Sequence, residues 1–213
     1  VQTLTGDLTM WVSDIVTVTT ENQSTLAYVV RSSGLFEANG VSLSGYSGDI
    51  DVDYDGTDYI RVSDLATISM QMNLLVEFTA FGFINIEVAD LQVINSYSPP
   101  REEYDFPLRV GEAWSNNYTQ TTDWSGESDY FDIPDDSTTQ TSSNHAIVAQ
   151  GNPNVPYSGC GSSYNVTTFD SSGQNVTSYR WWCPNANNDA LRNFQDDIGF
   201  DINFKLKTVN LVS

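Results

Sequence analysis

Residues Leu74 to Val88 read LLVEFTAFGFINIEV, and their apolar side chains recur at every second position. A period of two is the side-chain period of a β-strand, so this segment predicts strand rather than helix. Gly82, at its centre, predicts a bulge, a kink or the turn of a hairpin. The alternating apolar positions are Val76, Phe78, Ala80, Ile84, Ile86 and Val88.

The same alternation recurs elsewhere in the chain. It is clearest near the C-terminus, where Phe200, Ile202, Phe204 and Leu206 alternate with polar residues. Glycine after Asn or Asp supplies the positive φ that tight hairpin turns require. Turns are therefore predicted at Asn39-Gly40, at Asp55-Gly56 and over residues 170–173, and further strands at Ile15–Thr19 and Leu26–Val30.

Many short strands separated by turn residues predict an all-β fold, an antiparallel β-sandwich or barrel. The residues from Thr119 to Pro156 are poor in apolar side chains and predict long polar loops, with one strand at His145–Ala149. Residues 188–194 predict at most a single helical turn. We expect one β domain over residues 1–213. The prolines at 99 and 100 cannot donate to a sheet ladder, so a seam at residues 98–105 is the alternative, dividing β modules at 1–97 and 106–213.

Charge excludes two classes of partner. The chain has 28 acidic and eight basic residues and a net charge of −20. A nucleic-acid-binding protein needs a cationic surface to displace counterions from phosphates, and adsorption to anionic lipid headgroups needs the same. No segment approaches the ~20 apolar residues of a membrane span. We therefore expect no nucleic-acid partner and no membrane span.

Cys160 and Cys183 are the two cysteines of a chain rich in Ser, Thr and Asn, which favours one disulfide formed in an oxidising compartment. The chain begins with Val1 rather than Met, which fits a processed, secreted product. We therefore expect an extracellular or cell-surface protein. Four Asn-x-Ser/Thr sites predict glycosylation weakly, because about as many are expected by chance: Asn22, Asn117, Asn165 and Asn175.

An acidic run suggests a calcium site. Asp51, Asp53, Asp55 and Asp58 surround Gly56 with the spacing of the first half of an EF-hand loop, but Val62 stands where the bidentate glutamate would be. The alternative is a solvated acidic strand face, with Ile50, Val52 and Tyr54 turned to the core. A second acidic group is expected in a surface loop, at Asp129, Asp132, Asp135 and Asp136.

No catalytic motif stands out, and we expect a protein that is not an enzyme. His145 is the single histidine, predicted to be exposed in a polar loop, and no Gly-x-Ser-x-Gly elbow accompanies it. A hydrolase using two carboxylates is a third alternative, because acids are abundant throughout the chain.

The aromatic run from Tyr179 to Cys183 places Trp181 and Trp182 on opposite faces of a strand. One ring is expected in the core beside the disulfide, and the other at a subunit interface or stacked on a ligand.

The sequence predicts a structural subunit of a surface layer, sheath or fibre. Such a subunit would form a homo-oligomer or polymer through strand contacts, either at an N-terminal segment such as Val1–Thr9 or at an unpaired edge strand. We expect no cofactor. The alternative is a secreted carbohydrate-binding module, with Trp124, Trp181 or Trp182 stacking on sugar, in which calcium, if it binds, would bridge protein and sugar.

Overall fold

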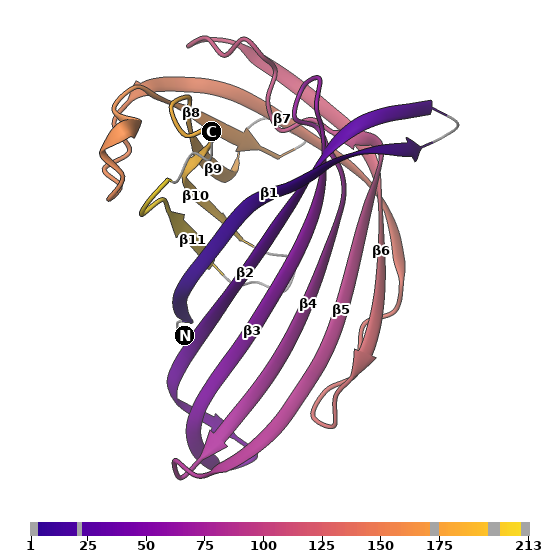
Figure 1. Cartoon of the computed structure of the whole chain (residues 1–213), viewed down its shortest axis with the longest axis vertical. Coiled ribbons are helices and arrows are strands. Elements are labelled where there is room, and N and C mark those ends of the chain that lie inside the picture. The colour runs from indigo at the N-terminus through magenta and orange to yellow at the C-terminus, as the bar shows by residue number, and fades with distance from the viewer. Residues whose placement is uncertain (1–3, 21–22, 171–174, 196–200, 210–213) are drawn as a thin grey trace. The chain divides into compact units, whose positions relative to one another are not determined.

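The computed structural model describes residues 4–20, 23–170, 175–195 and 201–209 of the 213-residue chain. Nearly all of the secondary structure is antiparallel β-strand (Figure 1). The long strands of the N-terminal half are β1 (Thr5–Thr20), β2 (Gln23–Leu43), β3 (Tyr46–Arg61), β4 (Thr67–Ala80) and β5 (Ile84–Arg101). They are followed by β6 (Ala113–Glu127), β7 (Ser137–Gly151), the 3₁₀ turn η1 (Ser158–Cys160), β8 (Ser163–Phe169), β9 (Val176–Cys183), β10 (Asn188–Gln195) and β11 (Asp201–Lys205).

The predicted all-β antiparallel fold with one disulfide is confirmed. The strands form one sheet in sequence order, with β1 and β11 as its end strands. The finer choice between a sandwich and a barrel stays a prediction. The described part of the chain also contains no helix long and apolar enough to cross a bilayer.

The chain divides into two compact units. The first comprises Val1–Glu102 and Tyr118–Gln140, and the second comprises Glu103–Asn117 and Thr141–Ser213. Strands β6 and β7 each contribute one end to each unit. The chain leaves the first unit after Glu102, inside the expected seam, but returns to it at Tyr118. The division into modules at 1–97 and 106–213 therefore stays a prediction.

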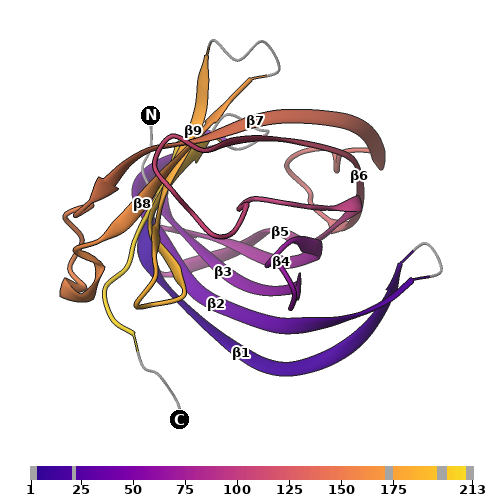
Figure 2. The same cartoon turned by 90° about the horizontal axis from the view of Figure 1, so that it is seen from above.

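The first unit is built from long hairpins that curve together (Figure 2). The segment Leu74–Val88 forms the end of β4, a turn and the start of β5, so Gly82 lies in a hairpin turn. Its alternating apolar side chains, except the exposed Ile84, belong to a core in which Phe78 is 1% exposed. The other members of this core are Ala80, Val88, Val41, Leu43, Ile50, Val76 and Ile86.

Two predicted hairpin turns are wrong. Asn39-Gly40 lies at a bulge within β2, where the pairing with β3 shifts between Ala38 and Val41. Asp55-Gly56 lies inside β3, with Gly56 opposite Ser32 and Met72. A Cβ on Gly56 would lie 2.3 Å from the Ser32 hydroxyl, so this glycine permits close approach rather than a turn.

The long polar loops predicted from Thr119 to Pro156 are also wrong, because β6 and β7 occupy most of this range. Backbone groups supply the ladder hydrogen bonds, so a polar, Thr- and Ser-rich segment pairs as well as an apolar one when a neighbouring strand is available. The helical turn predicted over residues 188–194 is strand β10. Most of the turn expected at residues 170–173, and Phe200, lie outside the described residues.

The second unit has its own core around the predicted disulfide, which is confirmed between Cys160 and Cys183. Both cysteines and Ala190 are buried, and Trp181 and Leu206 pack against them. The bridge links η1 to the end of β9 across 23 residues of sequence. A disulfide that closes a loop of this length stabilises the folded protein by about 3 kcal/mol, because it reduces the conformational entropy of the unfolded chain.

Candidate functional site

The strongest candidate for a site of interaction is the edge strand β1. It pairs with β2 from Thr5 to Thr20, and among the described residues of the first unit no strand pairs with its other side. An unpaired edge presents a row of N–H and C=O groups to any strand that arrives. β1 contains no lysine and no proline, two residues that commonly protect such edges, and its protective feature is a single register shift between Val12 and Asp14.

Large apolar side chains are exposed along the same strand. Val12 is 58% exposed, and Met10, Trp11 and Ile15 are 44–53% exposed. Because successive side chains point to opposite faces, Trp11 lies on the face opposite Met10 and Val12. Both faces of β1 therefore expose apolar surface beside the unpaired edge, which is the arrangement expected of a strand that another strand covers.

The predicted calcium residues lie on β3 and do not all converge. Asp51, Asp53 and Asp55 share one face of the strand, whereas Asp58 lies three residues further along and on the other face. Across the sheet, Asp51 lies opposite Glu37 and Glu77. Within the described ranges no group of three or more acidic, His or Cys side chains could hold a metal ion. Calcium binding stays a prediction.

The acidic face extends over four neighbouring strands, because Glu77 in turn lies opposite Glu87 on β5. The second acidic group follows β6 and is exposed, with the Asp136 carboxylate accepting a hydrogen bond from the Trp124 amide. Like charges directly opposite each other in a sheet destabilise it. The acidic face therefore makes the first unit sensitive to ionic strength.

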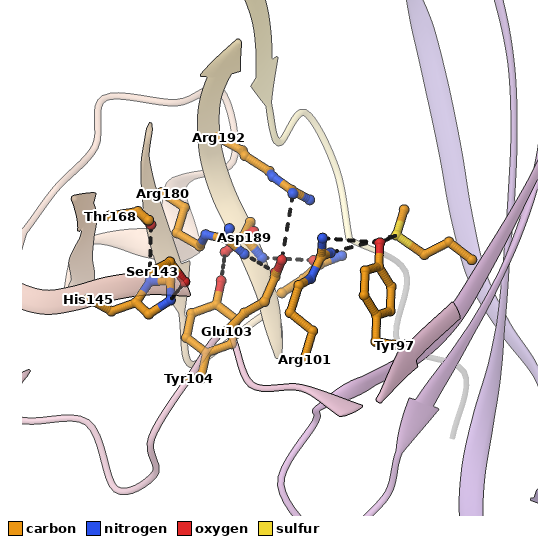
Figure 3. A network of polar contacts seen from close by, with 12 residues as sticks. Tyr97, Arg101, Glu103, Tyr104, Ser143, His145, Thr168, Arg180, Asp189 and Arg192 are labelled. Atoms are coloured by element: carbon orange, nitrogen blue, oxygen red, sulfur yellow. Dashed lines mark hydrogen bonds and ion pairs between the residues drawn. The ribbon is translucent and has the colours of Figure 1, made fainter. Parts of the chain in front are cut away.

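A buried polar network lies inside the second unit (Figure 3). Arg180 on β9 is 5% exposed and donates from Nη1 to the Glu103 carboxylate. The Tyr104 hydroxyl donates to the Asp189 carboxylate on β10. Arg192 approaches Glu103 at 3.8 Å. Two acids and two arginines thus lie together, with Arg180 buried and Arg192 keeping 28% of its side chain exposed, and opposite charges of this kind make the burial of Arg180 tolerable.

Burial and charge shift the pKa values of this network. Burial lowers the pKa of Arg180, but the acidic groups around it, with the Glu103 carboxylate the strongest, outweigh burial and leave that pKa raised. Burial raises the pKa of Asp189 more than Arg180 and Arg192 lower it. Burial, together with the Asp189 charge, raises the pKa of Tyr104 well above its usual value. These shifts favour a charged Arg180 guanidinium and a neutral Tyr104 hydroxyl in the folded protein.

The two tryptophans of β9 have different surroundings. Trp182 is 7% exposed and packs against Tyr104 and Phe106, with ring centroids 4.8 Å and 5.5 Å away. Trp181 is half-buried beside the disulfide. The structure thus gives Trp182 a packing role within the second unit, and Trp124 on β6 is half-buried.

The prediction that His145 is exposed is wrong. It lies on β7, is 5% exposed, and stacks on Trp114 with ring centroids 5.2 Å apart. Its Nε2 lies 2.9 Å from the Ser143 hydroxyl and its Nδ1 lies 3.1 Å from the Thr168 hydroxyl. Polar neighbours in sequence suggested a loop, but in a strand every second side chain points inward regardless of its neighbours.

The potential glycosylation sites are placed unequally. Asn117 and Asn175 are exposed, although the Asn175 amide donates to the Asp170 carboxylate at 2.7 Å. Asn165 is half-buried and accepts a hydrogen bond from Thr167, the buried threonine of its own Asn-x-Thr site. Asn22 lies outside the described residues. Of the three sites in the described part of the chain, Asn117 and Asn175 therefore have accessible side chains.

Sequence reasoning missed the buried network, since Glu103 and Tyr104 lie more than 70 residues from Arg180 along the chain. The available signal was Arg180 itself, a single charge in a strand of aromatic residues.

No family model, no curated protein and no solved structure matches this chain.

Proposed function

We propose that this protein is a structural subunit of an extracellular layer, sheath or fibre, which assembles with copies of itself by strand addition at β1. The observation that carries the proposal is the unpaired 16-residue edge with exposed apolar side chains on both faces. The disulfide is compatible with an oxidising, extracellular setting. The carbohydrate-binding alternative has less support, because Trp182 packs inside the second unit.

The contact energies available at β1 predict association that depends on the protein concentration. Fully burying a large apolar side chain contributes about 1.5–3 kcal/mol, and each ladder hydrogen bond about 0.5–1.5 kcal/mol net. Four side chains on β1 have roughly half of their surface still to bury, which gives on the order of 3–6 kcal/mol before the hydrogen bonds are counted. Association costs about 4–15 kcal/mol in lost freedom. The ladder bonds are therefore needed as well as the apolar contacts.

The partner strand decides the form of the assembly. Pairing of β1 with β1 of a second copy is self-complementary and stops at a dimer, whereas pairing with a different edge, such as β11, continues into a filament. Because each copy carries a charge of −20, salt should promote either form by screening repulsion.

The test is sedimentation velocity of the whole chain over a hundredfold concentration range, at 0.1 M and 1 M NaCl. The wild type should form dimers or larger species, and Val12→Lys should remain monomeric. Val176→Lys on β9 is a matched control, because Val176 is also a strand valine with 58% exposure. A wild type that is monomeric under every condition, or a Val12→Lys variant that assembles normally, would refute the proposal.

A further inference from the structure

A second apolar surface lies where two hairpin turns of the first unit meet. The β2–β3 turn and the β4–β5 turn are neighbours, because Gly48 on β3 pairs with Ala80 on β4 (Figure 1). Phe83 is 79% exposed and Phe81 is 62% exposed. The ring of Phe81 lies 6.0 Å from that of Tyr46 and 6.4 Å from that of Phe83. The aromatic tip is defined here as Tyr46, Phe81, Phe83 and Ile84.

The backbone of the aromatic tip is strained at Phe81, which carries one of these rings. The Phe83 amide donates to the Ala80 carbonyl at 3.2 Å, closing a turn whose central residues are Phe81 and Gly82. Both have positive φ, +55° at Phe81 and +74° at Gly82. This conformation favours Asn or Gly at both central positions and is costly for a bulky residue. An aromatic residue that accepts this strain while most of its ring stays in solvent indicates a contact outside the chain.

Charge is absent from the tip and negative behind it. Residues 38–48 and 78–86 contain no charged side chain. The nearest acid is Asp49 on β3, three residues or about 10 Å along the strand from Tyr46, and its carboxylate accepts a hydrogen bond from the Gly40 amide. On β4 and β5 the nearest acids are Glu77 and Glu87, each four residues from a tip phenylalanine, or about 13 Å at about 3.3 Å per residue. The arginines of β2 and β3, Arg31 and Arg61, are twelve or more residues away from the β2–β3 turn. An anionic partner is therefore disfavoured at this end of the sheet.

We propose that the aromatic tip inserts into the headgroup layer of a zwitterionic phospholipid bilayer. That layer is about 5–8 Å thick on each side of the hydrocarbon. The uncharged tip can thus reach the acyl boundary while the carboxylates stay outside, close to the outermost choline cations. Exposed rings of this kind favour the membrane interface, and tyrosine adds a polar group at the headgroup level. This interaction is peripheral and needs no membrane-spanning segment.

The test is co-sedimentation of the full chain with vesicles of pure phosphatidylcholine and with vesicles containing phosphatidylglycerol. Phosphatidylcholine should bind the wild type, and added phosphatidylglycerol should weaken binding at low salt. The double variant Phe81→Asn/Phe83→Ser should lose about tenfold or more in partition coefficient. Asn suits the positive φ at position 81, so the turn is preserved while the ring is removed.

Phe131→Ser is the matched control, since Phe131 is a 46% exposed phenylalanine of the first unit outside the tip. It should bind like the wild type, and so should the assembly variant Val12→Lys, which separates lipid binding from strand addition. The proposal is overturned if the wild type ignores phosphatidylcholine or binds only anionic vesicles. It is equally overturned if the double variant binds normally, or if its defect is lost oligomerisation instead of lost binding.

Discussion

At the scale of single residues, the second unit contains a buried arginine, Arg180, whose side chain is 6% exposed. Arg180 is held by Glu103 and lies with its guanidinium carbon 5.6 Å from the centre of the Tyr104 ring. Surface arginines such as Arg109, with 73% of its side chain exposed, have no comparable constraint. Removing the arginine from its ion pair should therefore lower the free energy of unfolding more at position 180 than at position 109.

Arg180→Met should lower the free energy of unfolding by about 3–5 kcal/mol, because it leaves Glu103 buried without its main partner. Arg109→Met, which removes an exposed pair with Glu112 at 3.9 Å, should cost about 1 kcal/mol or less. Urea titrations of both variants measure the difference. Equal effects at the two sites would show that the buried network does not stabilise the fold.

The raised pKa of Asp189 predicts a pH dependence of stability. Because its folded pKa lies above its unfolded value of 3.8, the stabilising contribution is fully present below about pH 4 and is lost as the pH rises through the folded pKa. Asp189→Asn removes this titration and keeps an oxygen that accepts from Tyr104. The stability advantage of the wild type over the variant should therefore shrink between pH 3 and pH 7.

This prediction is measured by urea unfolding of both proteins at several pH values. Asp105→Asn, a neutralisation at an exposed position of the same unit, is the control and should not reproduce the trend. An advantage that grew with pH would mean that Arg180 and Arg192, rather than burial, dominate the Asp189 carboxylate.

At the scale of elements, strand contacts require glycine at specific positions. Gly126 on β6 has φ of +129° and lies opposite Leu91 on β5. A Cβ at this position would lie 2.0 Å from the Asp90 carbonyl oxygen. A Cβ added to Gly151 on β7 would have no neighbouring atom within 4 Å.

Gly126→Ala should lower the free energy of unfolding by about 1–3 kcal/mol, since alanine fits neither the dihedral angle nor the space. Gly151→Ala should leave stability unchanged or raise it by up to about 1 kcal/mol, because alanine reduces the freedom of the unfolded chain. Thermal unfolding followed by circular dichroism would measure both variants. If Gly126→Ala is tolerated as well as Gly151→Ala, the close approach of β5 and β6 is incorrect.

At the scale of the whole molecule, a net charge of −20 and the line of acids from Glu37 to Glu87 predict a protein that salt stabilises. Raising NaCl from 0.1 M to 1 M shortens the Debye length from about 10 Å to about 3 Å, which screens this repulsion. The melting temperature should therefore rise with NaCl.

Glu77→Gln interrupts the acidic line at its centre and should reduce the salt dependence, while stabilising the protein by about 0.2–1 kcal/mol at low salt. Melting curves at four NaCl concentrations would measure both effects. A melting temperature that fell with salt would indicate that attractive ion pairs, not acidic repulsion, dominate the molecule.

The sequence alone determined the all-β antiparallel class and the Cys160–Cys183 disulfide, and it limited Gly82 to a bulge, a kink or a hairpin turn. These follow from local alternation, from turn chemistry and from a cysteine count of two. The tertiary structure alone decided that Asn39-Gly40 and Asp55-Gly56 lie within strands, that most of the polar residues 119–151 belong to β6 and β7, and that His145 and Trp182 are buried. It also brought Glu103 and Tyr104 to Arg180 and Asp189, and left β1 at an edge. The physical reason is that pairing and burial depend on which distant segment lies alongside, and a local pattern contains no information about that neighbour.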